Sequence, residues 1–157
     1  MKTTLLFLSV FLSASLFGQN VYIPDANFKA YLVGNSAINT NGDTEIQTRE
    51  AKLFNGSIKC DSLEIRQLTG LTSFRSITGL SCSSNKISRL DLTKNKKITY
   101  LNCSNNKIHN ISVSGLKYLT YFDCSFNRIV DLFVSKNKYL TYLVCSGNNI
   151  RNFQTTN

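Results

Sequence analysis

Histidine and acidic residues are scarce in this chain of 157 residues, and both shortages restrict its chemistry. His109 is the only histidine, and residues 82–157 hold just three acidic side chains, Asp91, Asp123 and Asp131. Catalytic triads and paired carboxylates need these residue types in groups, and no glycine-rich phosphate loop is present in their place. We therefore predict that the protein is not an enzyme and has no catalytic residues.

Long hydrophobic runs are also missing, except at the N-terminus. Lys2 precedes an apolar run at residues 5–12, small residues follow, and cleavage is expected near Gly18. This pattern is typical of a secretory signal peptide, here residues 1–18, and the run is shorter than the roughly 20 residues that span a bilayer. We predict a secreted or cell-envelope protein that is exported through a cleaved signal peptide and has no transmembrane segment.

Acidic charge is depleted in the second part of the chain. Residues 19–81 hold six basic and six acidic residues, whereas residues 82–157 hold eleven basic and three acidic residues, a net charge of +8. A basic surface on an exported protein favours an acidic protein, an acidic glycan or an anionic membrane as partner, and nucleic acid is not expected outside the cell. The alternative is that the lysines keep the protein soluble and its strand edges unpaired.

Cysteine and asparagine recur at a fixed spacing. Four cysteines follow one another every 21 residues, and each is followed by Asn after three residues and by Ile after five. A leucine or phenylalanine precedes each cysteine by two residues. The columns are Cys82, Cys103, Cys124 and Cys145; Asn85, Asn106, Asn127 and Asn148; Ile87, Ile108, Ile129 and Ile150; and Leu80, Leu101, Phe122 and Leu143. Such self-similarity predicts a repeat architecture.

Each unit fits the leucine-rich-repeat pattern L-x-x-L-x-L-x-x-N-x-L with cysteine at the third apolar place. The chain therefore resembles the short-repeat leucine-rich proteins that bacteria export, many of which carry a C-S-x-N signature. The resemblance covers about residues 60–157, with an irregular first unit opened by Cys60, in which Leu63 takes the Asn place, and about four regular units, the last incomplete. It implies a leucine-rich-repeat solenoid, α/β by class, with a parallel β-sheet on the concave face, turns or short strands on the convex side, and a small helical N-terminal cap.

The apolar-x-Cys alternation is that of a strand, so the cysteines should point into the core. Neighbouring parallel strands lie roughly 4.8 Å apart, whereas a disulfide needs Cβ atoms about 3.5–4.5 Å apart, so bonds along the column would be strained. We predict a ladder of free, buried thiols and no zinc site, since no histidine accompanies them. The Asn side chains should also turn inward as a ladder and satisfy backbone groups at the bend.

Residues 19–59 lack the repeat and are expected to form the N-terminal cap. Asp25 is a suitable N-cap for a short helix at residues 26–33. The apolar stripe of this helix would be Phe28, Tyr31 and Leu32.

Within the cap, residues 39–50 resemble an EF-hand calcium loop. The side-chain ligands would come from Asn39, Asn41, Asp43 and Glu50, with the backbone carbonyl of Glu45 as a further ligand. Two departures weaken the match, because Asn39 replaces an aspartate and Thr44 replaces the glycine of the sharp turn. Calcium of low affinity is one hypothesis, a degenerate loop that only caps the solenoid is the other, and no further cofactor is expected.

Binding in a solenoid is expected on the exposed columns of the concave face. A tyrosine precedes the strand leucine in three successive units, polar residues stand between leucine and cysteine, and one phenylalanine protrudes beyond the strand. Tyrosine marks many interfaces, although it is also a good strand residue that duplication would copy. The candidate ligand-binding residues are Tyr100, Tyr121, Tyr142, Asn102, Asp123 and Phe126.

These features favour a non-catalytic binding module for a protein or glycan. The alternatives are a structural envelope protein or a truncated relic of a longer leucine-rich-repeat protein. No polar cap follows the last repeat before Asn157, so self-association through an open C-terminal end is a further expectation.

Overall fold

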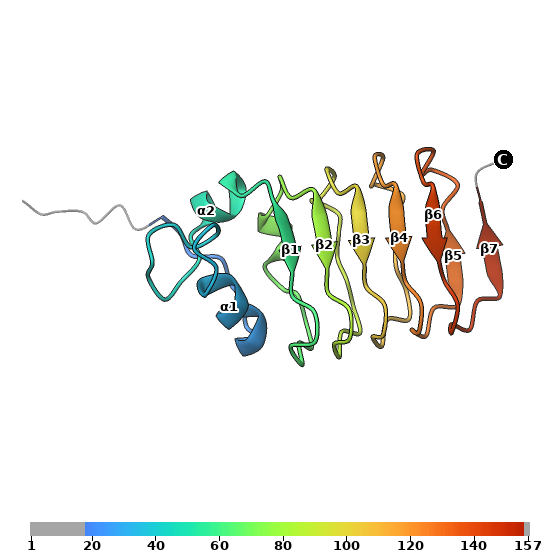
Figure 1. Cartoon of the computed structure of the whole chain (residues 1–157), viewed down its shortest axis with the longest axis horizontal. Coiled ribbons are helices and arrows are strands. Elements are labelled where there is room, and N and C mark those ends of the chain that lie inside the picture. Colours follow the sequence, from blue (N-terminus) through green and yellow to red (C-terminus); the bar gives the residue numbers. More distant parts are fainter. Residues whose placement is uncertain (1–17, 156–157) are drawn as a thin grey trace, which may run out of the picture.

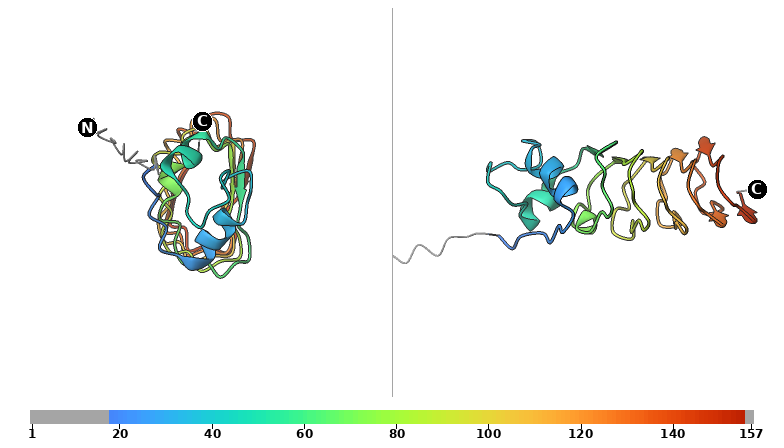
Figure 2. Two further views of the ribbon diagram at one scale, coloured as in Figure 1. Left: turned by 90° about the vertical axis from the view of Figure 1, so that its left-hand side faces the viewer. Right: turned by 90° about the horizontal axis from the view of Figure 1, so that it is seen from below.

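The computed structural model describes residues 18–155, which form a cap and a solenoid (Figure 1). Two short helices, α1 (Ala26–Val33) and α2 (Thr48–Leu53), stand at one end, and the remaining chain coils away from them in stacked turns. The view along the coil shows that successive turns superpose on one closed outline (Figure 2). All but the last residue of the expected signal peptide lies outside the described residues.

One side of the coil is a five-stranded parallel sheet in which each strand pairs with the equivalent strand of the next turn. The register joins Leu80 to Leu101, Leu101 to Phe122 and Phe122 to Leu143. The strands, in their order in the sheet, are β1 (Ser57–Lys59), β2 (Gly79–Ser81), β3 (Tyr100–Asn102), β4 (Tyr121–Asp123) and β6 (Tyr142–Val144). We call this side the strand face.

The other side of the coil, the return side, is mostly turns. Its regular elements are the 3-10 helix η1 (Leu71–Ser73) and a parallel pair of strands, β5 (Asp131–Phe133) and β7 (Asn152–Gln154). The predicted solenoid, with a parallel sheet on one side and turns or short strands on the other, is therefore confirmed. Within the described residues, both α-helices belong to the cap.

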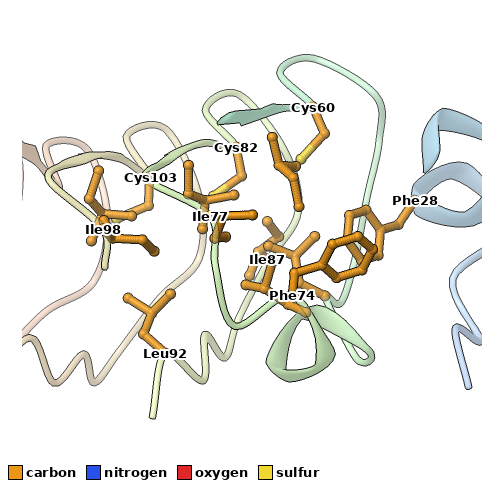
Figure 3. Packing of buried hydrophobic residues seen from close by; sticks show 14 of the residues in the cluster. Phe28, Cys60, Phe74, Ile77, Cys82, Ile87, Leu92, Ile98 and Cys103 are labelled. Atoms are coloured by element: carbon orange, nitrogen blue, oxygen red, sulfur yellow. The ribbon is translucent and has the colours of Figure 1, made fainter. Parts of the chain in front are cut away.

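The core is a continuous apolar column between the two sides, and its cysteines, isoleucines and leucines meet there (Figure 3). Leu80, Ile87 and Cys82 are fully buried, as are their equivalents in the next two turns. The last turn differs, because Leu143 and Cys145 are only half-buried. No later turn of the described residues covers them.

The sheet begins three residues before the expected start of the repeats at residue 60. Ile58 and Cys60 flank Lys59 with the same apolar-x-Cys alternation as the later strands, and both are fully buried. The backbone N–H of Lys59 donates to the hydroxyl of Tyr31 at 2.8 Å, so a cap residue bonds the outer edge of β1. The cap therefore covers the first strand of the solenoid.

The predicted helix at residues 26–33 is confirmed as α1, with Asp25 as its N-cap. Oδ1 of Asp25 accepts from the backbone N–H groups of Asn27 and Phe28. Its second oxygen, Oδ2, accepts from the N–H groups of Arg66 and Gln67 in the first turn of the solenoid. One carboxylate thus starts the helix and ties the cap to the repeats. Of the expected apolar stripe, Phe28 and Leu32 are fully buried and Tyr31 is half-buried.

Candidate functional site

The scaffold of the candidate site is held by the strand-exit Asn column, Asn85, Asn106, Asn127 and Asn148. Each side chain bonds both its own turn and the preceding one. In Asn127, Nδ2 donates to the carbonyls of Cys103, Cys124 and Ser125 at 2.9–3.1 Å, and Oδ1 accepts from the N–H of Ile108 at 2.9 Å. The expected ladder therefore runs through backbone groups of the preceding turn and not from one Asn side chain to the next.

The cysteine column lies behind these carbonyls. The prediction of free, buried thiols is confirmed for Cys82, Cys103 and Cys124, and Cys60 shares both properties. For Cys145 the predicted free thiol is confirmed but its burial is wrong, because no later strand of the described residues covers this half-buried side chain. Burial raises the pKa of the Cys60 and Cys124 thiols to about 12, and the neighbouring Asp61 and Cys145, respectively, add to the effect. Thiols that stay protonated and buried are poor nucleophiles and metal ligands, so this column is a structural feature.

The predicted tyrosine column forms a continuous aromatic stack on the strand face. The rings of Tyr100 and Tyr121 lie 4.5 Å apart at an interplanar angle of 14°, and those of Tyr121 and Tyr142 lie 4.7 Å apart at 7°. These separations match the spacing between strands, since each tyrosine opens the equivalent strand of its turn. Tyr100 is 39% exposed and Tyr142 is 52% exposed, so the stack presents its edge to solvent.

The polar residues beside the stack have local roles. Oδ1 of Asn102 accepts from both the backbone N–H and the hydroxyl of Ser104, and Oδ1 of Asp123 does the same with Ser125. These bonds fix the two side chains where each strand ends. The structure thus places Asn102 and Asp123 next to the tyrosine stack as rigid polar groups.

Phe126 stands at the end of this surface and is 60% exposed. Its φ of 50° lies in the left-handed region, which a bulky side chain rarely adopts. Ser84 and Asn105 hold the same conformation in the preceding turns, and Gly147 holds it in the next. A Cβ atom at Gly147 would lie 2.6 Å from Cδ1 of Phe126, so the ring packs closely against that glycine. The bend therefore imposes the backbone conformation, and the phenylalanine is specific to one turn.

Two columns on and near the return side were missed by the sequence analysis. The first is the threonine before each strand: the hydroxyls of Thr99, Thr120 and Thr141 donate to the threonine carbonyl of the preceding turn at 3.0–3.2 Å. The second is the return-side Asn pair, Asn95 and Asn137, whose Nδ2 atoms each donate to two carbonyls of the preceding turn. Both were visible as 21- or 42-residue spacings, but neither belongs to the pattern that identifies the repeat.

The loop that resembles an EF-hand is held by its own hydrogen bonds. Oε1 of Glu50 accepts from the N–H and the hydroxyl of Thr40 and from the N–H of Asn41, and Oε2 accepts from the N–H of Gln47. The last of these bonds is half of a capping box that starts α2. Glu50, one of the expected calcium ligands, is thus a buried residue of the capping box.

The other expected ligands are also engaged. Nδ2 of Asn39 donates to the carbonyl of Asp43 at 2.7 Å, and Nδ2 of Asn41 donates to Oδ2 of Asp43 at 2.9 Å. The ligand expected from Glu45 is its backbone carbonyl, which is not involved when its side chain pairs with Lys29 at 2.5 Å. Within residues 18–155, no three His, Cys, Asp or Glu side chains lie close enough to hold a metal ion together. Calcium binding stays a prediction, and a bound ion would have to displace donors from Glu50 and Asp43.

Comparisons with known proteins place this geometry among the leucine-rich repeats of internalins. No family model matches the chain, and no curated protein is similar to it. The functional domain of InlJ from Listeria monocytogenes, which includes a cysteine ladder, is similar with a TM-score of 0.73 and 36% identity over 83% of this chain and 29% of that chain.

Two further internalins of the same species, InlF and internalin C2, show TM-scores of 0.64 and 0.62 at 16% identity. These matches cover 89% and 84% of this chain, and 49% and 74% of the internalin chains. The chain thus spans less than a third of the InlJ domain and about half of InlF. The neighbours share the parallel solenoid fold, and none of the described helices is long and apolar enough to cross a membrane.

Proposed function

We propose that this protein is a non-catalytic, exported binding module that holds a protein partner on its strand face. The observation that carries the proposal is the stack of Tyr100, Tyr121 and Tyr142, which is exposed on a rigid sheet. The likeness to internalin repeats supports a protein-binding repeat module.

The stack suits a binding surface for two physical reasons. Tyrosine offers a large apolar area with a polar tip, and stacked rings lose little conformational freedom when a partner covers them. The neighbouring Asn102 and Asp123 are already fixed by their bonds to serine hydroxyls, so they are preorganised as polar contacts at the rim. Phe126 extends the apolar area towards the end of the strands.

The proposal is tested by replacing Tyr100, Tyr121 and Tyr142 together with serine. The purified protein and this variant are immobilised, and the proteins captured from the surroundings of the producing cell are compared by quantitative mass spectrometry. Since central aromatic residues often contribute 2 kcal/mol or more each, we expect specific partners to fall by at least about 30-fold.

A matched control is available on another part of the surface. Tyr118 and Tyr139 form a second stacked pair, 6.2 Å apart and more than half exposed, in the turns before the strands. Replacing both with serine removes similar aromatic area and should leave capture within about twofold of the original protein. Equal capture by the triple variant, or equal loss in both variants, would contradict the proposal.

Export is tested separately. The N-terminal residue of the protein recovered from the medium or the envelope should be Gln19 or a close neighbour, because the signal peptide is expected to be removed near Gly18. Recovery of the protein only from the cytoplasm, with Met1 intact, would contradict export without affecting the binding proposal.

A further inference from the structure

The tyrosine stack stops abruptly at Tyr100. The parallel register places Gly79 of β2 opposite Tyr100 of β3, so the position that holds a tyrosine in three later turns has no side chain here. In β1 the equivalent residue is Ser57, which is also small. One face of the Tyr100 ring therefore lacks the neighbour that Tyr121 and Tyr142 provide to one another.

This gap is a real hollow in the surface. It has a volume of about 550 Å³ and is lined by Ser57, Lys59, Asp61, Leu80, Ser81 and Tyr100. We call it the Gly79 notch. A Cβ atom at Gly79 would lie 2.4 Å from Oγ of Ser57, so a side chain at Gly79 would require the Ser57 hydroxyl to move. Because Gly79 itself has no side chain, a ring that stacks on this face of Tyr100 would come from a partner.

The rim of the notch is polar and balanced in charge. Oδ1 of Asp61 accepts from the hydroxyl of Ser81 at 2.7 Å and from the N–H and hydroxyl of Ser83 at 2.6 and 2.7 Å. These three bonds fix the carboxylate, and within the described residues its Oδ2 accepts no hydrogen bond. Lys59 supplies a cation at the same rim, so neither a cationic nor an anionic group is favoured there.

We propose that the Gly79 notch takes a tyrosine side chain of the protein partner, which stacks on Tyr100 as the fourth ring of the column. This inference rests on the proposed function and names a specificity pocket within it. The stack shows that the sheet holds parallel rings 4.5–4.7 Å apart, and the notch continues the column by one step. The neutral phenol suits a rim with opposite charges, because Asp61 offers an acceptor and Lys59 a donor to its hydroxyl.

The test uses small probes and isotope-labelled protein. N-acetyl-tyrosinamide, N-acetyl-argininamide and methyl β-glucopyranoside are titrated, and amide shifts are followed by NMR. The tyrosine probe should move the signals of Gly79, Ser81 and Tyr100 with a Kd on the order of millimolar, as expected for one stacked ring. The other two probes should bind at least about tenfold more weakly.

The matched variants fill the notch or leave it open. Gly79→Tyr combined with Ser57→Gly removes the close contact and supplies the fourth ring from the chain itself, so tyrosine binding should be lost. Tyr139→Ser, outside the strand face, should bind the probe within about twofold of the original protein. Ser57→Gly alone is the background of the filled variant and leaves the notch open, so it should still bind the probe. Circular dichroism establishes that each variant is folded before it is compared.

Several outcomes overturn the inference: stronger binding of the arginine probe or the glucoside in the notch, no shift of the notch signals, or unchanged binding by the filled variant. Its failure is distinguishable from that of the proposed function. If the triple tyrosine variant loses its partner and the filled variant keeps it, the strand face binds without using the notch. If both variants keep the partner, the strand face is not the binding surface.

Discussion

Two sets of asparagine side chains join adjacent turns of this solenoid, and they differ in how completely their hydrogen-bonding groups are paired. In the strand-exit Asn column, represented by Asn127, the amide donates three hydrogen bonds and its oxygen accepts one. In the return-side Asn pair, Asn95 and Asn137, each Nδ2 donates two bonds, but Oδ1 is buried without a donor among the described residues. Both sets join adjacent turns, yet only the first is fully satisfied.

The difference explains why one column repeats in every turn and the other does not. Among residues 18–155, the N–H of Ile108 has no acceptor except the side-chain oxygen of Asn127, so the bend needs that amide. The carbonyls bonded by Asn137 already accept from the N–H groups of Leu116 and Leu119 within their own turn. Leu116 stands in the equivalent place in the turn between Asn95 and Asn137. The carbonyls that an amide there would bond, those of Leu92 and Asn95, already accept from the N–H groups of Asn95 and Ile98, so neither is left unpaired.

The largest expected effect is that of Asn127→Leu. The change leaves the N–H of Ile108 buried without its acceptor, which costs roughly 1–3 kcal/mol. It also removes the bonds to the carbonyls of Cys103 and Cys124, each worth about 1 kcal/mol, although these carbonyls keep bonds from Asn106 and Asn148. We expect the free energy of unfolding, measured in urea, to fall by about 4 kcal/mol. Asn137→Leu is the matched control, because it makes the same chemical change in the other set. A loss below about 1 kcal/mol for Asn127→Leu would mean that the two sets are energetically equivalent.

One physical reason explains why the sequence predicted the strand-exit Asn column and missed the return-side Asn pair. A residue that every turn requires recurs at a strict spacing, so the 21-residue pattern of Asn127 and its equivalents predicted the fold and the inward cysteines. The same spacing predicted a Tyr column, whereas the stacking of its rings became visible only in the structure. Asn95 and Asn137 alternate with the apolar residues Phe74 and Leu116. Because not every turn requires an amide at this position, only a 42-residue spacing is left in the sequence.

Local geometry set the limits of the remaining predictions. The loop at residues 39–50 has the spacing of a calcium loop, but the spacing cannot show that Glu50 caps α2 instead. The absence of a tyrosine at Gly79 was visible in the sequence as a gap in a column. That the gap is a hollow became apparent only from the register of β2 and β3 and from the position of Ser57.

Alkaline pH should destabilise the side of the solenoid that holds the strand-exit Asn column more than the return side. The reason is that the strand-exit column bonds the carbonyls of the buried cysteines. Burial raises the pKa of the Cys82 thiol, with neighbouring Cys103 adding to the effect. The unfolded chain ionises thiols near about pH 8.5–9, where the folded protein still retains the proton. Stability is therefore fully present below that pH and is lost as pH rises towards the folded pKa.

The measurement is the slope of unfolding free energy against pH for the original protein and for Cys82→Ala. Each thiol that stays protonated in the folded state lowers the free energy of unfolding by about 1.4 kcal/mol per pH unit. Between about pH 9 and 10.5, the slope for Cys82→Ala should therefore be shallower than that of the original protein by about this value. Comparing slopes removes the constant cost of the cavity and every contribution to the slope that the two proteins share. Equal slopes would show that Cys82 ionises in the folded protein.

Within the return-side Asn pair, the two leucine variants should differ. Asn137→Leu removes the buried Oδ1 without a donor and leaves its two carbonyl partners bonded, so we expect stabilisation by about 1 kcal/mol. Asn95→Leu also removes such an oxygen, but the carbonyl of Phe74 accepts only from Asn95, so no gain is expected. Thermal and urea unfolding of both variants measure the difference. Destabilisation of Asn137→Leu beyond about 1 kcal/mol would mean that its two donated bonds outweigh the unsatisfied oxygen.

The smallest expected effect on stability is that of Phe126→Asn, a change at the exposed residue beside the strand-exit Asn column. Phe126 directly precedes Asn127 and holds a left-handed backbone at φ 50°, a conformation that asparagine tolerates better than phenylalanine. Asn105 already occupies the equivalent position one turn earlier, so Phe126→Asn should stabilise the fold by about 0.5 kcal/mol, after loss of the ring contact with Gly147 is included. The same variant should weaken partner capture if Phe126 belongs to the binding surface. A variant that is less stable but binds equally well would instead assign the phenylalanine to packing between turns.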